Sequence, residues 1–185
     1  VPANLKSDLD AYILHRTATF AARRQGGAVQ SISAEADRTA LLRFYGYLER
    51  LQRAPQGADL SISLLCRTDL GDLTQGYATW LQNNQNCKFS TIANYLNGLV
   101  SITTYAYANF EPAAEVLNAE PNPLTQLINL RGQAEKASKT QQMYEKRVGG
   151  WLEWEDVQKA RVAAMNKLND AAQAATPAAK RSLLR

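Results

Sequence analysis

The sequence predicts an all-α protein: a compact bundle of four to five helices, a linker, and one or two helices of a truncated second domain. Strong helix formers dominate, alternation of apolar and polar residues is absent, and turn residues fall between stretches of helical periodicity. Of the 185 residues, 45% are apolar and 21% charged, which excludes wholesale disorder. The expected ranges are 1–135 for the first domain, 136–150 for the linker and 151–185 for the start of the second.

The first third of the chain predicts two long helices. The first is expected over residues 3–24, with Phe20 on its apolar side and Gly26 as its stop signal. The second is expected to begin with Ser33 as its cap and to end before Pro55.

The remaining elements alternate with polar or glycine-containing turns. After a loop at 59–68, helices are expected at 70–84, from a Ser90 cap to about Asn109, briefly at 112–118, from Leu124 to a point between 139 and 148, at 155–174 after a joint at Gly149, and from Thr176 onward. Because the chain starts at Val1 and stops at Arg185 inside an expected helix, we expect a piece of a longer protein.

Composition and motifs exclude several classes of function. No window approaches 18 consecutive apolar residues and no signal peptide is visible, so neither a membrane span nor a membrane partner is expected. Cys66 and Cys87 lack CxxC spacing and are interpreted as small core or edge residues in a reducing compartment. His15 alone is too little for a histidine-based metal site. With no P-loop, GxGxxG, HExxH or GxSxG, we expect no metal, cofactor or catalysis within these residues.

The net charge of +4 is unevenly distributed. Residues 1–60 hold eight Lys/Arg against six Asp/Glu, residues 61–120 two against five, and residues 121–185 eleven against six. Basic flanks around a less basic middle fit a polyanion held from two sides. Ordinary solvated helix faces explain the same numbers.

The second helix has a basic stripe opposite its apolar face. At steps of three or four residues, this stripe reads Thr39, Arg43, Gly46, Arg50, Arg53. Its arginines span about 15 Å at 1.5 Å per residue, so each could meet a phosphate. A solvated face is the alternative.

The fourth helix holds no charged residue from Ser90 to Phe110. Its polar side reads Thr91, Asn94, Gly98, Ser101, Tyr105. Neutral hydrogen-bonding groups suit a surface pressed against a DNA groove, with Lys88 and the helix N-terminus facing phosphates. Close packing against a neighbouring helix through small residues is the alternative.

Five elements in order resemble the N-terminal core-binding (SAM-like) domain of tyrosine recombinases, the phage-integrase family. The first is a helix whose family pattern is matched by Ser33, Asp37, Arg38, Leu41, Phe44, Tyr47 and Leu48, with Ser33 and Asp37 in place of the usual threonine and tyrosine. The others are matched by Leu70, Leu73, Tyr77 and Leu81, by Ser90-Thr91-Ile92 with Tyr95, Leu96 and Leu99, by Asn122-Pro123 with a basic segment, and by Trp151 to Val157.

The resemblance implies half of a C-shaped clamp around double-stranded DNA in an intracellular protein, located in the nucleus if the host is eukaryotic and otherwise in the cytoplasm. The catalytic tyrosine and arginines of such a protein would lie beyond Arg185, so none of the eight tyrosines here is expected to be the nucleophile. It also implies contacts between residues 3–24 and a neighbouring protomer on DNA. Combined with the two polar stripes, it gives the expected DNA-binding residues: Arg38, Thr39, Arg43, Arg50, Arg53, Lys88, Ser90, Thr91, Asn94, Ser101, Lys136, Lys139. A helical protein-interaction module that uses residues 90–109 as an oligomerisation seam is the alternative function.

Overall fold

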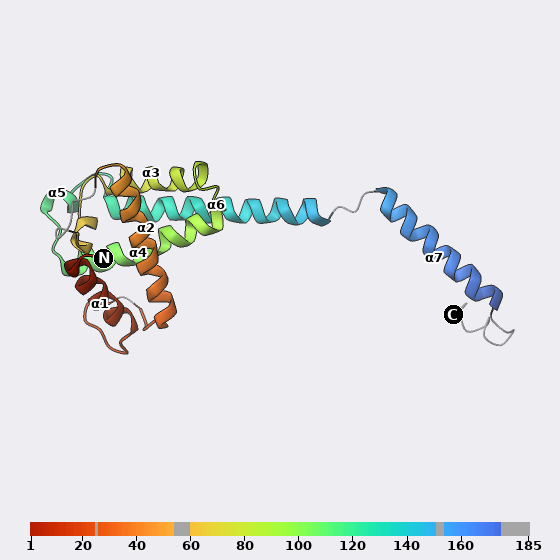
Figure 1. Cartoon of the computed structure of the whole chain (residues 1–185), viewed down its shortest axis with the longest axis horizontal. Coiled ribbons are helices and arrows are strands. Elements are labelled where there is room, and N and C mark those ends of the chain that lie inside the picture. Colours follow the sequence, from red (N-terminus) through yellow and green to blue (C-terminus); the bar gives the residue numbers. More distant parts are fainter. Residues whose placement is uncertain (25, 54–59, 151–153, 175–185) are drawn as a thin grey trace. The chain divides into compact units, whose positions relative to one another are not determined.

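In the ranges that its computed structural model describes, residues 1–24, 26–53, 60–150 and 154–174, all the regular secondary structure is helical (Figure 1). This confirms the all-α prediction. In chain order the elements are α1 (Ala3–Thr17), α2 (Ser31–Arg50), the 3-10 helix η2 (Ile62–Leu65), α3 (Leu70–Asn83), α4 (Phe89–Asn109), α5 (Ala114–Leu117), α6 (Pro123–Gly150) and α7 (Trp154–Ala174). The expected Pro55 stop, the Trp151–Glu153 segment and the helix from Thr176 lie outside the described residues.

The chain divides into two compact units, Val1–Gln141 and Gln142–Arg185. The division falls within α6, in the range where the sequence predicts a linker. The expected helix end before Val148 is wrong, because α6 continues through Gly150. Residues 137–148 are mostly good helix formers, which explains the continuation.

Helix α4 forms the centre of the first unit, where it contacts α2, α3 and η2. Its side chains Ile92, Leu96, Leu99, Ile102 and Ala106 are buried in one apolar core with residues from α1, α2, α3 and α6. Burying each of these leucine and isoleucine side chains contributes roughly 1.5–3 kcal/mol. The packing of these helices therefore fixes which face of α4 remains open to solvent.

The aromatic residues of α2 belong to this core. Phe44, Tyr45 and Tyr47 are at most 8% exposed, so these rings are part of the core. The ring centroids of Phe44 and Tyr77 are 5.4 Å apart at an interplanar angle of 66°, an edge-to-face arrangement that joins α2 to α3.

Helix α1 ends at Thr17, so the prediction of a helix over residues 3–24 is wrong in its last two turns. The guanidinium of Arg24 explains this end, since it donates hydrogen bonds to the carbonyls of His15, Ala18 and Thr19 at 2.6–3.0 Å. A cationic side chain that hydrogen-bonds to carbonyls at the C-terminus of a helix stabilises that terminus. Phe20, expected on the apolar side, is 92% exposed.

The two serines expected to cap helices lie inside them instead. Gln30 precedes α2 and Lys88 precedes α4, each with an extended backbone and no side-chain cap. Ser33 and Ser90 therefore occupy the first turn of their helices, where a side chain no longer serves as the N-cap.

Helix α2 ends at Arg50 in a Schellman motif. Gln52 adopts a left-handed φ of 55°, and the amide of Arg53 donates to the carbonyl of Leu48 at 3.0 Å. Leu51, the C-cap residue, is 44% exposed, and Arg53 lies beyond the helix.

A buried polar group joins α1 to α2. The Tyr12 phenol donates a 2.5 Å hydrogen bond to Oδ2 of Asp37, and an Nη atom of Arg16 lies 3.5 Å from the same oxygen. Asp37 is 6% exposed, and burial raises the pKa of its carboxyl while Tyr12 and Arg16 oppose that shift.

The described ranges contain no helix long and apolar enough to cross a bilayer. Within the same ranges, no group of three or more His, Cys, Asp or Glu side chains is placed to hold a metal ion. Cys66 and Cys87 are free and half-buried, and burial raises the pKa of the Cys66 thiol to about 11.

Candidate nucleic-acid interface

The solvent-facing side of α4 is a row of uncharged polar residues. Asn94, Asn97 and Thr104 are exposed and Ser101 is half-exposed, at steps of three or four that keep them in line. We call these four residues the α4 row. It spans about 15 Å along the helix axis at 1.5 Å per residue.

The α4 row differs from the polar line that the sequence predicts. Gly98 is buried, because a Cβ built on it would lie 2.8 Å from Cβ of Ala40 and 3.1 Å from Cα of Asp37. Tyr105 turns inward, with its ring centroid 5.3 Å from that of Tyr12. The polar line predicted from the sequence therefore lies partly on the side of α4 that packs against α2. Close packing between these two helices accounts for Gly98.

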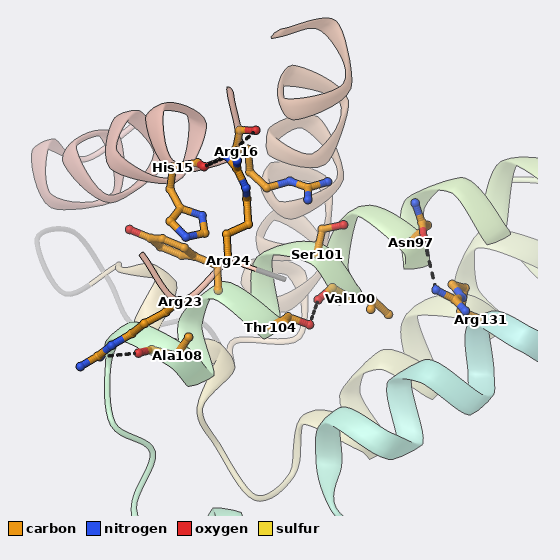
Figure 2. A pocket seen from close by; sticks show the side chains of 11 residues that line it. His15, Arg16, Arg23, Arg24, Asn97, Val100, Ser101, Thr104, Ala108 and Arg131 are labelled. Carbon is orange, nitrogen blue, oxygen red and sulfur yellow. Dashed lines mark hydrogen bonds between the residues drawn. The ribbon is translucent and has the colours of Figure 1, made fainter. Parts of the chain in front are cut away.

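Arginines from two other helices border the α4 row. Arg16 of α1 and Arg131 of α6 line one cavity together with Asn97, Ser101 and Thr104 (Figure 2). The Nη1 atom of Arg131 donates to Oδ1 of Asn97 at 3.4 Å. The row is thus neutral along its length and positively charged at its margins.

The basic stripe of α2 stands over aromatic rings. The Arg43 guanidinium carbon is 4.9 Å from the ring centroid of Tyr95, and that of Arg50 is 5.6 Å from the ring of Trp80. Both distances suit cation–π attraction. Arg43, Gly46 and Arg50 line a cavity of about 420 Å³ with Trp80. Both arginines are exposed, so their guanidinium groups are accessible to phosphates.

Arg38 and Thr39 are engaged within α2. An Nη atom of Arg38 lies 3.3 Å from Oε2 of Glu35, and the Thr39 hydroxyl donates to the Glu35 carbonyl at 2.9 Å. Arg38 and Thr39 therefore already have polar partners within α2, whereas the guanidinium groups of Arg43 and Arg50 face aromatic rings. Arg53 is exposed after the end of α2, so it does not continue the helical line.

The remaining predicted residues lie at the start of α4 and along α6. Lys88 is exposed at the N-cap of α4, while Ser90 and Thr91 are half-exposed in its first turn. Lys136 and Lys139 are exposed on α6, one to two turns after Arg131. The start of α4 offers backbone amides and a positive helix end to an anion.

Sequence reasoning missed four residues of this surface, Arg16, Trp80, Asn97 and Arg131. Asn97 carried a usable signal, because it lies three residues after Asn94 on an uncharged helix. Arg16, Trp80 and Arg131 carried none, since only the packing of α1, α3 and α6 places them at this surface.

The buried tyrosines have no feature of an activated nucleophile. Burial raises the pKa of Tyr12, Tyr45 and Tyr77, which keeps each phenol in its neutral form. The surface described above offers hydrogen-bond donors and acceptors beside fixed positive charge.

Comparison with protein-family models, with curated proteins and with solved structures finds no match to this chain.

Proposed function

We propose that this chain binds double-stranded DNA through the α4 row and the arginines around it, as the core-binding half of a tyrosine-recombinase clamp. The single observation that carries the proposal is the combination of a neutral, hydrogen-bonding helix face with arginines at its margins. A helix of this kind fits the major groove, which is about 12 Å wide. Its margins then meet the phosphate strands on either side of the groove.

The roles of the residues follow from their chemistry. Asn94 and Asn97 carry amides, which pair with the edge of adenine in the major groove. Arg43 and Arg50 are exposed arginines whose charge attracts phosphates of any sequence. The expected consequence is that the asparagines influence sequence preference, whereas the arginines set overall affinity.

The proposal includes a contact between protomers at the N-terminal segment, residues 3–24. Leu14 is 68% and Phe20 is 92% exposed, so this segment presents apolar side chains to solvent. A neighbouring protomer on the same DNA would cover them. The clamp assignment itself, and its SAM-like identity, rest on the resemblance of the sequence.

The alternative is a helical interaction module with residues 90–109 as an oligomerisation seam. Gly98, the small residue on which a seam would depend, packs against α2 of the same chain, so its enlargement would disturb the fold. The molecular mass of the purified chain in solution, measured without DNA, distinguishes a stable oligomer from a monomer.

Fluorescence anisotropy of a labelled duplex tests the proposal. Replacing Arg43, Arg50 and Arg53 together by glutamine is expected to weaken binding to all duplexes. The matched control replaces Lys159, Arg161 and Lys167 by glutamine, which removes the same formal charge from exposed positions on α7. The proposal fails if the two triple variants lose affinity equally, since net charge alone would then explain binding.

A further inference from the structure

A basic cavity of about 230 Å³ lies where α1, α4 and α6 meet (Figure 2). The end of α1 and the loop after it form one wall, Asn97, Ser101 and Thr104 of the α4 row form the floor, and Arg131 of α6 closes the other side. A single water needs only about 10–15 Å³ of such space. The cavity therefore has room for a polyatomic anion.

Positive charge predominates in this cavity. Its lining includes four arginines, at positions 16, 23, 24 and 131, and no aspartate or glutamate. Two carboxylates approach from outside the lining, Asp37 at 3.5 Å from Arg16 and Glu135 at 3.4 Å from Arg131. Arg24 donates to backbone carbonyls, which leaves its formal charge uncompensated by those bonds.

Three buried polar atoms in this lining have no hydrogen-bond partner. They are Nε of Arg16, Nε of Arg131 and Nδ1 of His15, and of these Nε of Arg131 lies 3.4 Å from Oε1 of Glu135. A buried donor without a partner, such as Nε of Arg16, is destabilising, and an anionic oxygen satisfies it. His15 Nε2 lies 3.1 Å from the carbonyl of Ala22, and because a carbonyl can only accept, Nε2 is the donor of that hydrogen bond.

We propose that this cavity binds a phosphate group between the guanidinium groups of Arg16 and Arg131, with the Ser101 hydroxyl beside it. Arginine suits phosphate because its planar donors match the spacing of two phosphate oxygens. The phosphate belongs either to the backbone of bound DNA or to a free phosphorylated molecule. The first source rests on the proposed function, and the second does not.

The direct test is a titration of the full chain with inorganic phosphate, followed by NMR of the arginine side-chain Nε–Hε signals. Sodium chloride at equal ionic strength is the reference. The signals of Arg16 and Arg131 are expected to shift saturably, with a Kd on the order of 1–10 mM. The signal of Arg67, which pairs with Asp69, is expected to stay in place. If the signals of Arg16 and Arg131 show no saturable shifts, the proposal is overturned, regardless of whether the chain binds duplex DNA.

A second measurement identifies the source of the phosphate. Arg131→Gln is preferred to a change at Arg16, because removal of Arg16 leaves the buried Asp37 without its ion pair. If the phosphate belongs to the DNA backbone, Arg131→Gln weakens duplex binding about tenfold more than Arg161→Gln on α7. It also reduces the slope of the logarithm of the binding constant against the logarithm of salt concentration by about one unit. With a free phosphate, both variants bind duplex equally while Arg131→Gln still abolishes the NMR shifts. Either result supports the phosphate site, and shifts without any duplex binding would refute the proposed function alone.

Discussion

The phenol of Tyr12 donates a 2.5 Å hydrogen bond to the buried carboxylate of Asp37 and so ties α1 to α2. Asp37 also adjoins Gly98 of α4, since a Cβ on that glycine would lie 3.1 Å from the Asp37 Cα. Three helices therefore meet around one acidic residue. The position of α4 relative to α1 and α2, on which the candidate interface depends, is set at this point.

Asp37 makes the stability of the fold depend on pH. Burial raises the pKa of this carboxyl above its ordinary value of 3.8 in the folded state. Below that ordinary value the carboxyl is protonated in both the folded and the unfolded chain, so its ionisation does not lower the free energy of unfolding. As pH rises from that ordinary value to the raised folded value, the unfolded chain loses its proton while the folded chain keeps it, so the free energy of unfolding falls, and above the folded value it stays constant.

Asp37→Asn is expected to remove this dependence. The free energy of unfolding of the variant minus that of the wild type should increase from about pH 4 toward neutral pH. Urea denaturation of both proteins across this range measures the difference. A difference that stays constant or decreases with pH would contradict the assignment.

Gly98→Ala is expected to destabilise the protein by about 1–3 kcal/mol, because the new methyl group would lie 2.8 Å from Cβ of Ala40. Helix propensity alone predicts the opposite sign, a gain of about 1 kcal/mol. Gly46→Ala in α2 is the matched control, since no atom lies within 4 Å of the position that its new Cβ would take, and it is expected to stabilise. Thermal or urea unfolding of the two variants measures these changes in stability. A stabilised Gly98→Ala protein would refute the close approach between Gly98 and Ala40.

Asn97→Ala is expected to change which duplexes bind best. A bidentate amide–adenine pair discriminates by about 1–3 kcal/mol, whereas loss of a phosphate contact weakens all sequences alike. Selection from a randomised duplex pool, performed with wild type and variant, measures the preference. An unchanged ranking of sequences with uniformly lower affinity would remove Asn97 from base recognition.

A chain that stops at residue 141 is expected to fold and to keep the duplex affinity of the full chain within about threefold. Among the residues that the structure describes, the apolar core runs from Leu5 to Ala134, inside the first compact unit. The α4 row and its arginines lie there too. Circular dichroism measures the folding of the truncated chain, and fluorescence anisotropy measures its duplex affinity. A truncated chain that folds but loses binding would show that residues 142–185 contribute to the interface.

Helical periodicity predicted most of the elements and their buried faces. Helices α3 and α4 differ from the predicted ranges by one residue at an end, because Leu, Ile and Tyr recur there at helical spacing between clear turn residues. The end of α1 was missed, since Arg24 reaches back to the helix carbonyls through a contact that no local pattern encodes.

The candidate site was predictable only along single helices. Arg43, Arg50 and Asn94 lie on exposed faces as their spacing indicates. The placement of Arg16 and Arg131 beside Ser101 depends on how α1 and α6 pack against α4. Gly98 shows the limit most clearly, because a small residue in a polar line suits a helix contact as well as an open surface.

The salt dependence of duplex binding tests the central claim most directly. We expect the logarithm of the binding constant to fall linearly with the logarithm of salt concentration, with a slope near −0.9 for each phosphate neutralised. The Arg43, Arg50, Arg53→Gln triple variant should reduce the magnitude of that slope by about three units. No duplex binding at about 50 mM salt, or a slope that the triple variant leaves unchanged, would contradict DNA binding through this surface.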